Sequence, residues 1–83
     1  MKKIHTGNEG YAFVYQGDDG TMYLVSLCGG IVWRQVGIIL TPEERAAFLA
    51  DPTSVDAIAT SMCYDFDPFR DREVPEDLRS QMK

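Results

Sequence analysis

Few residues suited to catalysis or to soft-metal binding occur in the chain, whose 83 residues include a single histidine, His5, and two cysteines, Cys28 and Cys63. Acyl transfer needs a nucleophile, a base and an orienting group. His5 stands in a leading segment, and a turn explains the glycines that follow Cys28, so no such group is indicated. One histidine and two distant cysteines also cannot supply four zinc ligands. The sequence therefore predicts no enzymatic activity and no cofactor.

Long apolar runs are also missing. No window approaches the roughly 18 apolar residues of a membrane helix. The residues after Met1 include His5, Asn8 and Glu9 where an export signal would carry its apolar stretch. A cytoplasmic location is expected, and thiols in that compartment are kept reduced. We therefore expect Cys28 and Cys63 to be two reduced, buried thiols, with a single disulfide or a redox pair as the alternatives.

Basic residues are scarce: eight Lys and Arg face 13 Asp and Glu, for a net charge of −5. Residues 63–77, CYDFDPFRDREVPED, are called the acidic segment below. They hold six acids and two arginines, and so carry −4 of that charge. An acidic chain repels a phosphate backbone and an anionic membrane surface, which disfavours both as partners. A basic protein surface is the partner that this charge favours.

The first half of the chain reads as strands. Two glycines and two aspartates at 17–20 supply the positive φ of a tight hairpin turn. The stretch 21–27 is apolar on both faces, which is typical of a central strand that other elements cover. Gly37 indicates a bulge or a close backbone approach. The expected strands are residues 11–15, 21–27 and 31–40, with 3–6 as an additional edge strand.

The second half reads as helices. Thr41-Pro42-Glu43-Glu44 predicts a helix start with a capping box, and Pro52 ends that helix. A second helix is expected from Thr53 or Ser54 and a short third one from Pro75. Strands followed by helices predict an α+β fold in one domain, residues 1–83, with strands at about 3–40 and helices at about 41–83. The side chains expected to cover one sheet face are Phe48, Leu49, Val55, Ile58, Ala59 and Met62.

Asp65-Phe66-Asp67 has the spelling of a metal-binding pair. In enzymes that use such a pair for magnesium-dependent phosphoryl transfer it follows a buried strand, whereas here it follows a predicted helix. A calcium loop would need a glycine at its sharp turn, and none follows. A divalent-metal protein is therefore kept only as the weakest alternative.

Protein recognition remains. Aromatic anchors beside carboxylates suit a basic partner, because the rings fill pockets while the acids pair with Lys or Arg. Phe66 and Phe69 could serve as such anchors, although we favour an inward orientation that completes the core. The leading hypothesis is a small acidic inhibitor that occludes a basic surface, by analogy of size and charge alone with immunity proteins and phage-encoded inhibitors. The expected partner-binding residues are Asp65, Asp67, Asp71, Glu73, Glu76, Asp77, Phe66 and Phe69.

The alternative is a homodimeric structural or accessory protein. The helices cover one face of the predicted sheet, which leaves apolar side chains on the other face without a cover. A second copy of the chain could bury them. The candidates for this dimer face are Tyr11, Phe13, Tyr15, Tyr23 and Trp33.

Overall fold

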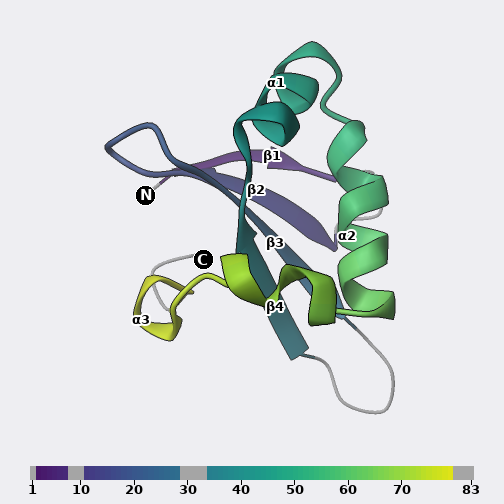
Figure 1. Ribbon diagram of the computed structural model, residues 1–83. Coiled ribbons are helices and arrows are strands. Elements are labelled where there is room, and N and C mark those ends of the chain that lie inside the picture. The colour runs from purple at the N-terminus through teal and green to yellow at the C-terminus, as the bar shows by residue number, and fades with distance from the viewer. Residues whose placement is uncertain (1, 8–10, 29–33, 80–83) are drawn as a thin grey trace.

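The computed structural model describes residues 2–7, 11–28 and 34–79. A four-stranded antiparallel sheet in the order β1-β2-β3-β4 is followed by helices, which confirms the α+β prediction (Figure 1). The strands are β1 (Lys2–Thr6), β2 (Ala12–Gln16), β3 (Met22–Cys28) and β4 (Arg34–Ile39). The helices are α1 (Pro42–Ala50), α2 (Ser54–Tyr64), the 3₁₀ helix η1 (Asp67–Arg72) and α3 (Glu76–Arg79). Residues 31–33 of the predicted third strand lie outside the described residues.

The turn between β2 and β3 is the predicted hairpin. Gly20 has a φ of 88°, a conformation that glycine adopts without steric cost. The amide of Gly17 donates to the carbonyl of Thr21 at 2.9 Å, which closes the turn. This turn sets the register that pairs Val14 with Leu24 and Tyr15 with Tyr23.

The sheet has two apolar faces. In β2, β3 and β4 the even-numbered side chains lie on one face and the odd-numbered side chains on the other. Even-numbered residues such as Val14, Leu24 and Ile38 join the main core with the helices. Odd-numbered residues such as Tyr15, Tyr23 and Val25 form a second, smaller cluster on the other face. The central strand β3 is therefore covered on both sides, as its two apolar faces predict.

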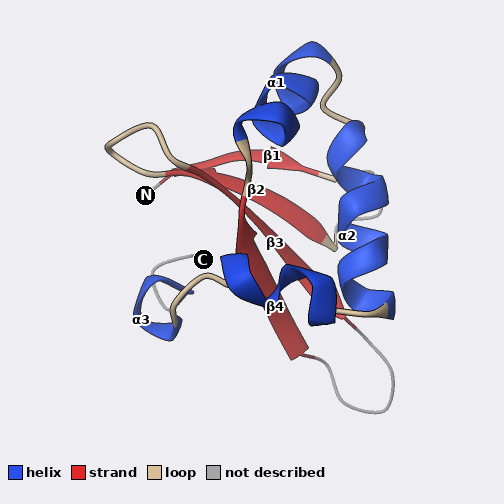
Figure 2. Cartoon of the chain, viewed as in Figure 1, coloured by secondary structure: helices blue, strands red, loops and turns tan. Residues whose placement is uncertain are grey.

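Helices α1 and α2 cover the main-core face (Figures 1 and 2). Val55, Ala59 and Met62 of α2 are buried and Ile58 packs against them, as the apolar stripe predicts. The prediction for α1 is wrong at Leu49, whose exposure is 67%. Its neighbour Phe48 is buried, because the short helix turns a single large apolar side chain toward the sheet.

The chain beyond α2 wraps around the free edge of β4 (Figure 1). Phe66 is buried in the main core, while Val74 is buried in the second cluster with Leu78 packed against it. Between them, Glu73 bridges Ile38, and the amide of Val74 donates to the carbonyl of Gly37 at 2.9 Å. The acidic segment therefore crosses from one face of the sheet to the other.

Gly37 permits that crossing. It pairs with Val25 in unbroken register, so the predicted bulge is absent there, while the predicted close approach is confirmed. A Cβ at this position would lie 3.3 Å from Val25 Cγ2 and 3.4 Å from Val74 Cγ2. The backbone of β4 thus lets Val74 pack directly against the sheet.

Cys28 and Cys63 form a disulfide across 35 positions of sequence, with a Cα–Cα distance of 5.2 Å. The expectation of two separate, reduced thiols is therefore wrong for this structure. The bond joins the end of β3 to the last turn of α2. Ser26 supports it, because its buried hydroxyl lies 3.3 Å from Cys63 Sγ and, beside a disulfide sulfur, can only be the donor.

Within the described part of the chain, no helix has the length and apolar character that crossing a bilayer requires.

Candidate functional site

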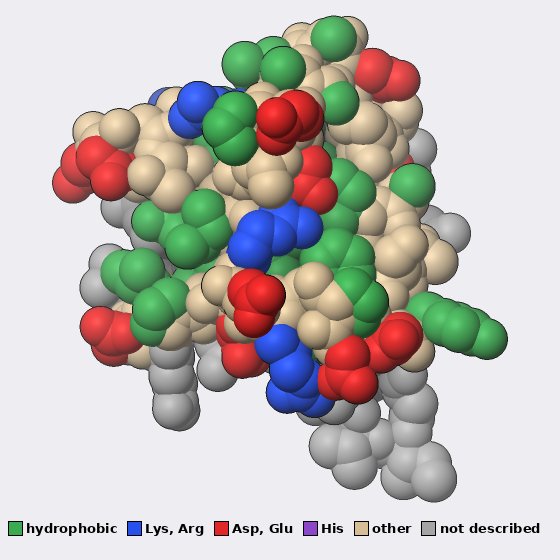
Figure 3. Space-filling model, viewed as in Figure 1, with side chains coloured by type: hydrophobic (Ala, Val, Ile, Leu, Met, Phe, Trp, Pro, Cys, Tyr) green, Lys and Arg blue, Asp and Glu red, His purple; other side chains and the backbone are tan. Residues whose placement is uncertain are grey.

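The carboxylates of the acidic segment face solvent. Asp65 follows the end of α2, Asp67 and Asp71 lie on η1, and Glu73 follows it. All four are exposed, as is Asp77 on α3. In Figure 3, acidic side chains gather around η1 and the nearby end of α2, with basic groups between them. The backbone position of Glu76 begins α3, whereas its side chain lies outside the described residues.

One arginine neutralises part of this surface locally. Arg70 Nε donates to Asp67 Oδ1 at 2.6 Å, in an ion pair that is largely exposed on both sides. The hydrogen bond and charge of Asp67, with smaller contributions from Glu73 and Asp65, raise the pKa of Arg70 above its usual range. Asp71 and Glu73 form no ion pair with any other described side chain. Their charges are available to a partner.

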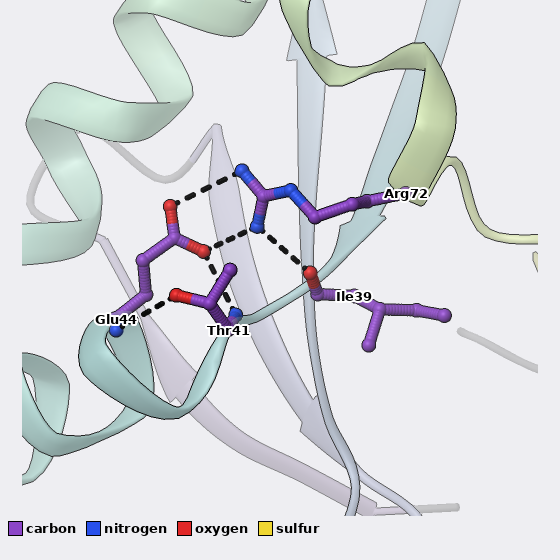
Figure 4. A network of polar contacts seen from close by, with 4 residues as sticks. All are labelled: Ile39, Thr41, Glu44 and Arg72. Carbon is purple, nitrogen blue, oxygen red and sulfur yellow. Dashed lines mark hydrogen bonds and ion pairs between the residues drawn. The ribbon is translucent and has the colours of Figure 1, made fainter.

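The second arginine, Arg72, points toward Glu44 at the start of α1 (Figure 4). Arg72 donates through Nη1 and Nη2 to the two carboxylate oxygens of Glu44, the second contact being 3.3 Å long. Its Nη1 also donates to the carbonyl of Ile39 at 3.0 Å. A two-point guanidinium–carboxylate contact fixes both distance and orientation. Arg72 therefore ties η1 to the end of β4 and the start of α1.

Glu44 is already engaged by its own helix. Thr41 and Glu44 form the predicted capping box, with the Thr41 amide donating to Glu44 Oε1 at 2.9 Å and the Glu44 amide donating to Thr41 Oγ1 at 3.1 Å. Burial raises the pKa of Glu44. The hydrogen bonds and positive charge of Arg72, together with the hydrogen bonds from Thr41, outweigh this effect, so the pKa of Glu44 lies below its ordinary value. This carboxylate is thus held ionised in the folded protein.

Two aromatic rings of the acidic segment pack against the main core. Phe66 is buried in the main core and Phe69 packs partly against it, so both turn inward, as we favoured. The guanidinium of Arg70 lies 6.0 Å from the centre of the Phe66 ring, and that of Arg72 lies 5.7 Å from the Phe69 ring. Each ring thus stabilises an arginine that is also paired with a carboxylate. The segment is fixed at several points along its length.

The sequence analysis missed Tyr64, the last residue of α2, whose exposure is 93%. A signal for it existed in the helical period. Two residues after Met62, the side chain at position 64 points about 200° around the helix from the buried stripe. The second residue of the acidic segment is therefore an exposed aromatic side chain.

Tyr64 borders a shallow hollow with a volume of about 400 Å³, open to solvent and mostly apolar in its lining. The hollow lies between the last turns of α2 and the start of η1. Its lining residues are Thr60, Ser61, Tyr64, Asp65, Pro68 and Phe69.

The proposed dimer face is partly covered by the chain itself. Tyr15 and Tyr23 are buried in the second cluster beneath Val74 and Leu78. Phe13 is half-buried, with Lys3 Nζ 4.6 Å from the centre of its ring. Of the other candidates on this face, Tyr11 is exposed and Trp33 lies outside the described residues.

The residues considered for catalysis or metal binding are separated. Cys28 is bonded to Cys63, and the ring of His5 packs edge-on against Phe48 with 5.4 Å between ring centres. Across residues 2–7, 11–28 and 34–79, no three His, Cys, Asp or Glu side chains are grouped closely enough to hold a metal ion.

Comparison with protein-family models, with curated proteins and with solved structures found no match for this chain. Its function is therefore argued from the arrangement of its own residues.

Proposed function

We propose that this protein is a small non-enzymatic binding module that attaches to a basic surface of another protein through its acidic segment. Attachment would cover that surface and inhibit whatever the surface normally binds. Asp65, Asp67, Asp71 and Glu73 form the electrostatic part of the interface, with Asp77 and Glu76 at its far end. Phe66 and Phe69 contribute from the inside, by holding the segment in place.

The observation that carries this proposal is the fixed position of an exposed acidic surface. The segment begins at the disulfide of Cys63, is anchored by Phe66, is tied to α1 by Arg72 and is anchored again by the buried Val74. A preformed surface loses little conformational entropy on binding, which favours affinity. A merely solvating acidic stretch has no need of such anchoring.

The charges also set the kinetics expected of binding. Exposed carboxylates such as Asp71 and Glu73 steer a basic partner toward the segment and accelerate association. The Debye length shrinks from about 10 Å at 0.1 M salt to about 3 Å at 1 M. Association with the partner should therefore slow as salt is added, whereas a dimer held by apolar faces would not respond in this way.

The redox state of Cys28 and Cys63 indicates the cellular compartment in which the protein acts. The sequence predicts the cytoplasm, where thiols are kept reduced. The disulfide argues against that location, because such bonds persist chiefly in oxidising compartments. Alkylation of free thiols in rapidly quenched cells distinguishes the two locations. Modification of both cysteines would support the cytoplasm, and protection of both would support an oxidising compartment.

The test compares two double variants of equal charge. Asp71→Asn with Glu73→Gln neutralises the acidic segment, while Asp18→Asn with Glu43→Gln removes two exposed acids elsewhere. Each immobilised protein is exposed to lysate from the encoding organism, and captured proteins are compared. We expect a basic protein to be retained by the wild type and the control pair and lost from the segment pair. The proposal fails if no captured protein distinguishes the two variants.

A further inference from the structure

The acidic segment contains three aromatic residues that are each followed by, or packed near, a carboxylate. Two of them already hold an arginine. Phe66 has Arg70 at 6.0 Å, and Arg70 is bound to Asp67, the residue after Phe66. Phe69 has Arg72 at 5.7 Å, and Arg72 is bound to Glu44. A ring together with a carboxylate thus forms a guanidinium site twice, once with Asp67 of the segment itself and once with Glu44 of α1.

The third pair, Tyr64 with Asp65, has the same components without the cation. Among the Lys and Arg side chains that the structure describes, none stands over the Tyr64 ring or forms an ion pair with Asp65. Asp65 Oδ1 accepts from the backbone amide of Asp67 at 3.2 Å, which orients the carboxylate. Its charge acts on Arg70 at a distance, but Arg70 forms its ion pair with Asp67. The hollow beside this pair is lined by Pro68 and Phe69.

The end of α2 adds to the attraction for a cation. The helix has 11 residues, and its last turn contains no basic side chain. The carbonyl end of a helix carries about half a negative charge, which a nearby cation stabilises. Thr60 and Ser61 of that last turn line the hollow, so a cation placed there meets the helix end and Asp65 together.

We infer that the hollow beside Tyr64 binds one arginine side chain of the basic partner. The guanidinium stacks on the exposed Tyr64 ring and pairs with Asp65, while the methylene stem lies against Pro68 and Phe69. This inference rests on the proposed function, since it identifies where the partner's principal contact is made. Arginine is favoured over lysine because a planar guanidinium can stack on a ring and bind a carboxylate at two points.

The first experiment uses peptides and needs no identified partner. A glycine-spaced peptide with three arginines is titrated into isotopically labelled protein at low salt, and NMR shifts are followed. We expect the largest shifts at Thr60, Ser61, Tyr64 and Phe69. The same peptide with citrulline, a neutral isostere of arginine, should produce none of them. A lysine peptide of equal charge should bind several-fold more weakly.

Variants then isolate the ring. Tyr64→Ala should weaken binding of the arginine peptide about tenfold, and Tyr64→Phe should keep most of it, because the ring is the contact. The matched control is Leu49→Ala, which removes another exposed apolar side chain, on α1. It should bind the peptide as the wild type does. Since Tyr64 is exposed, its replacement leaves the fold intact.

Three results would overturn the inference. They are equal binding of the citrulline peptide, binding unaffected by Tyr64→Ala, and shifts centred on Asp71 and Glu73 with none at Thr60 or Ser61. The proposed function is judged separately by capture of the partner. If capture of the partner is lost in the Asp71→Asn, Glu73→Gln variant but is unchanged in Tyr64→Ala, the acidic interface is supported. The arginine site beside Tyr64 is then not part of that interface.

Discussion

Arg72 donates hydrogen bonds from both terminal nitrogens to Glu44, which lies 28 positions away in sequence. This contact joins the acidic segment to the first turn of α1. The two side chains are 28% and 21% exposed, respectively. Hydrogen bonds between charged groups contribute more when water is partly excluded. This contact therefore holds the acidic segment more firmly than the exposed pair of Arg70 with Asp67.

Replacing Arg72 by Met tests this difference. Methionine keeps an apolar stem near Phe69 while removing every donor, so we expect the free energy of unfolding to fall by about 2 kcal/mol. Arg70→Met is the matched control, and the loss of its exposed ion pair should destabilise the protein much less. Urea denaturation measures the free energy of unfolding of both variants, provided that the dependence of this free energy on urea concentration is the same as in the wild type. Equal losses from the two variants would contradict the structural role given to Arg72.

Acid should weaken the same contact. The folded pKa of Glu44 lies below its ordinary value of 4.5, which its unfolded state retains. Its contribution to stability is therefore complete above that ordinary value and is lost as pH falls through the lowered folded pKa. The stability difference between wild type and Glu44→Gln should shrink between about pH 7 and about pH 3. Urea midpoints across this range measure it, and a constant difference would rule the linkage out.

Gly37→Ala should loosen the crossing at the edge of β4. The added Cβ meets Val25 and Val74 at distances that require one of them to move. Overpacking of this kind costs about 1–3 kcal/mol, partly offset because alanine suits a strand better than glycine. We expect a net loss of about 1 kcal/mol.

Hydrogen exchange adds a local measurement, because the Val74 amide bonds to the Gly37 carbonyl and should lose protection. A Val74→Ala background provides the control. If Val74 is the neighbour that must move, Gly37→Ala costs less there than in the wild type. Unchanged protection of the Val74 amide would show that the strand absorbs the methyl group without displacing the segment.

Local signals in the sequence predicted most of the elements. The turn at 17–20 and the capping box of Thr41 with Glu44 each depend on residues a few positions apart, so their geometry follows from neighbours alone. The burial of Met62 and its stripe likewise follows from the helical period.

Contacts between distant residues could not be predicted in this way. The path of the acidic segment around β4 depends on Val74 fitting against Gly37, and no local pattern encodes that fit. Arg72 looked like one more surface charge, since its partner Glu44 belongs to a different helix. The exposure of Tyr64, in contrast, follows from the helical period, because position 64 lies almost opposite the buried Met62 on α2.

The disulfide was also within reach of the sequence. Cys28 shares the even numbering of Leu24 on β3, and Cys63 directly follows Met62 on the buried stripe, so both point toward the same interface. The rule that cytoplasmic thiols stay reduced outweighed this pattern. The positions of the two cysteines on β3 and α2 predict the bond better than the expected compartment does, because the positions determine which side chains face each other.

Breaking the disulfide should lower stability substantially. Closing 35 positions of chain restricts the unfolded state, and its loss should cost about 3–4 kcal/mol. Urea unfolding with and without reductant measures this cost. A Cys28→Ala, Cys63→Ala variant should match the reduced wild type and ignore reductant. Two reactive thiols in the folded, unreduced protein would contradict the bond. Because Phe66, Arg72 and Val74 still hold the acidic segment, the reduced protein should retain its partner under conditions where it stays folded.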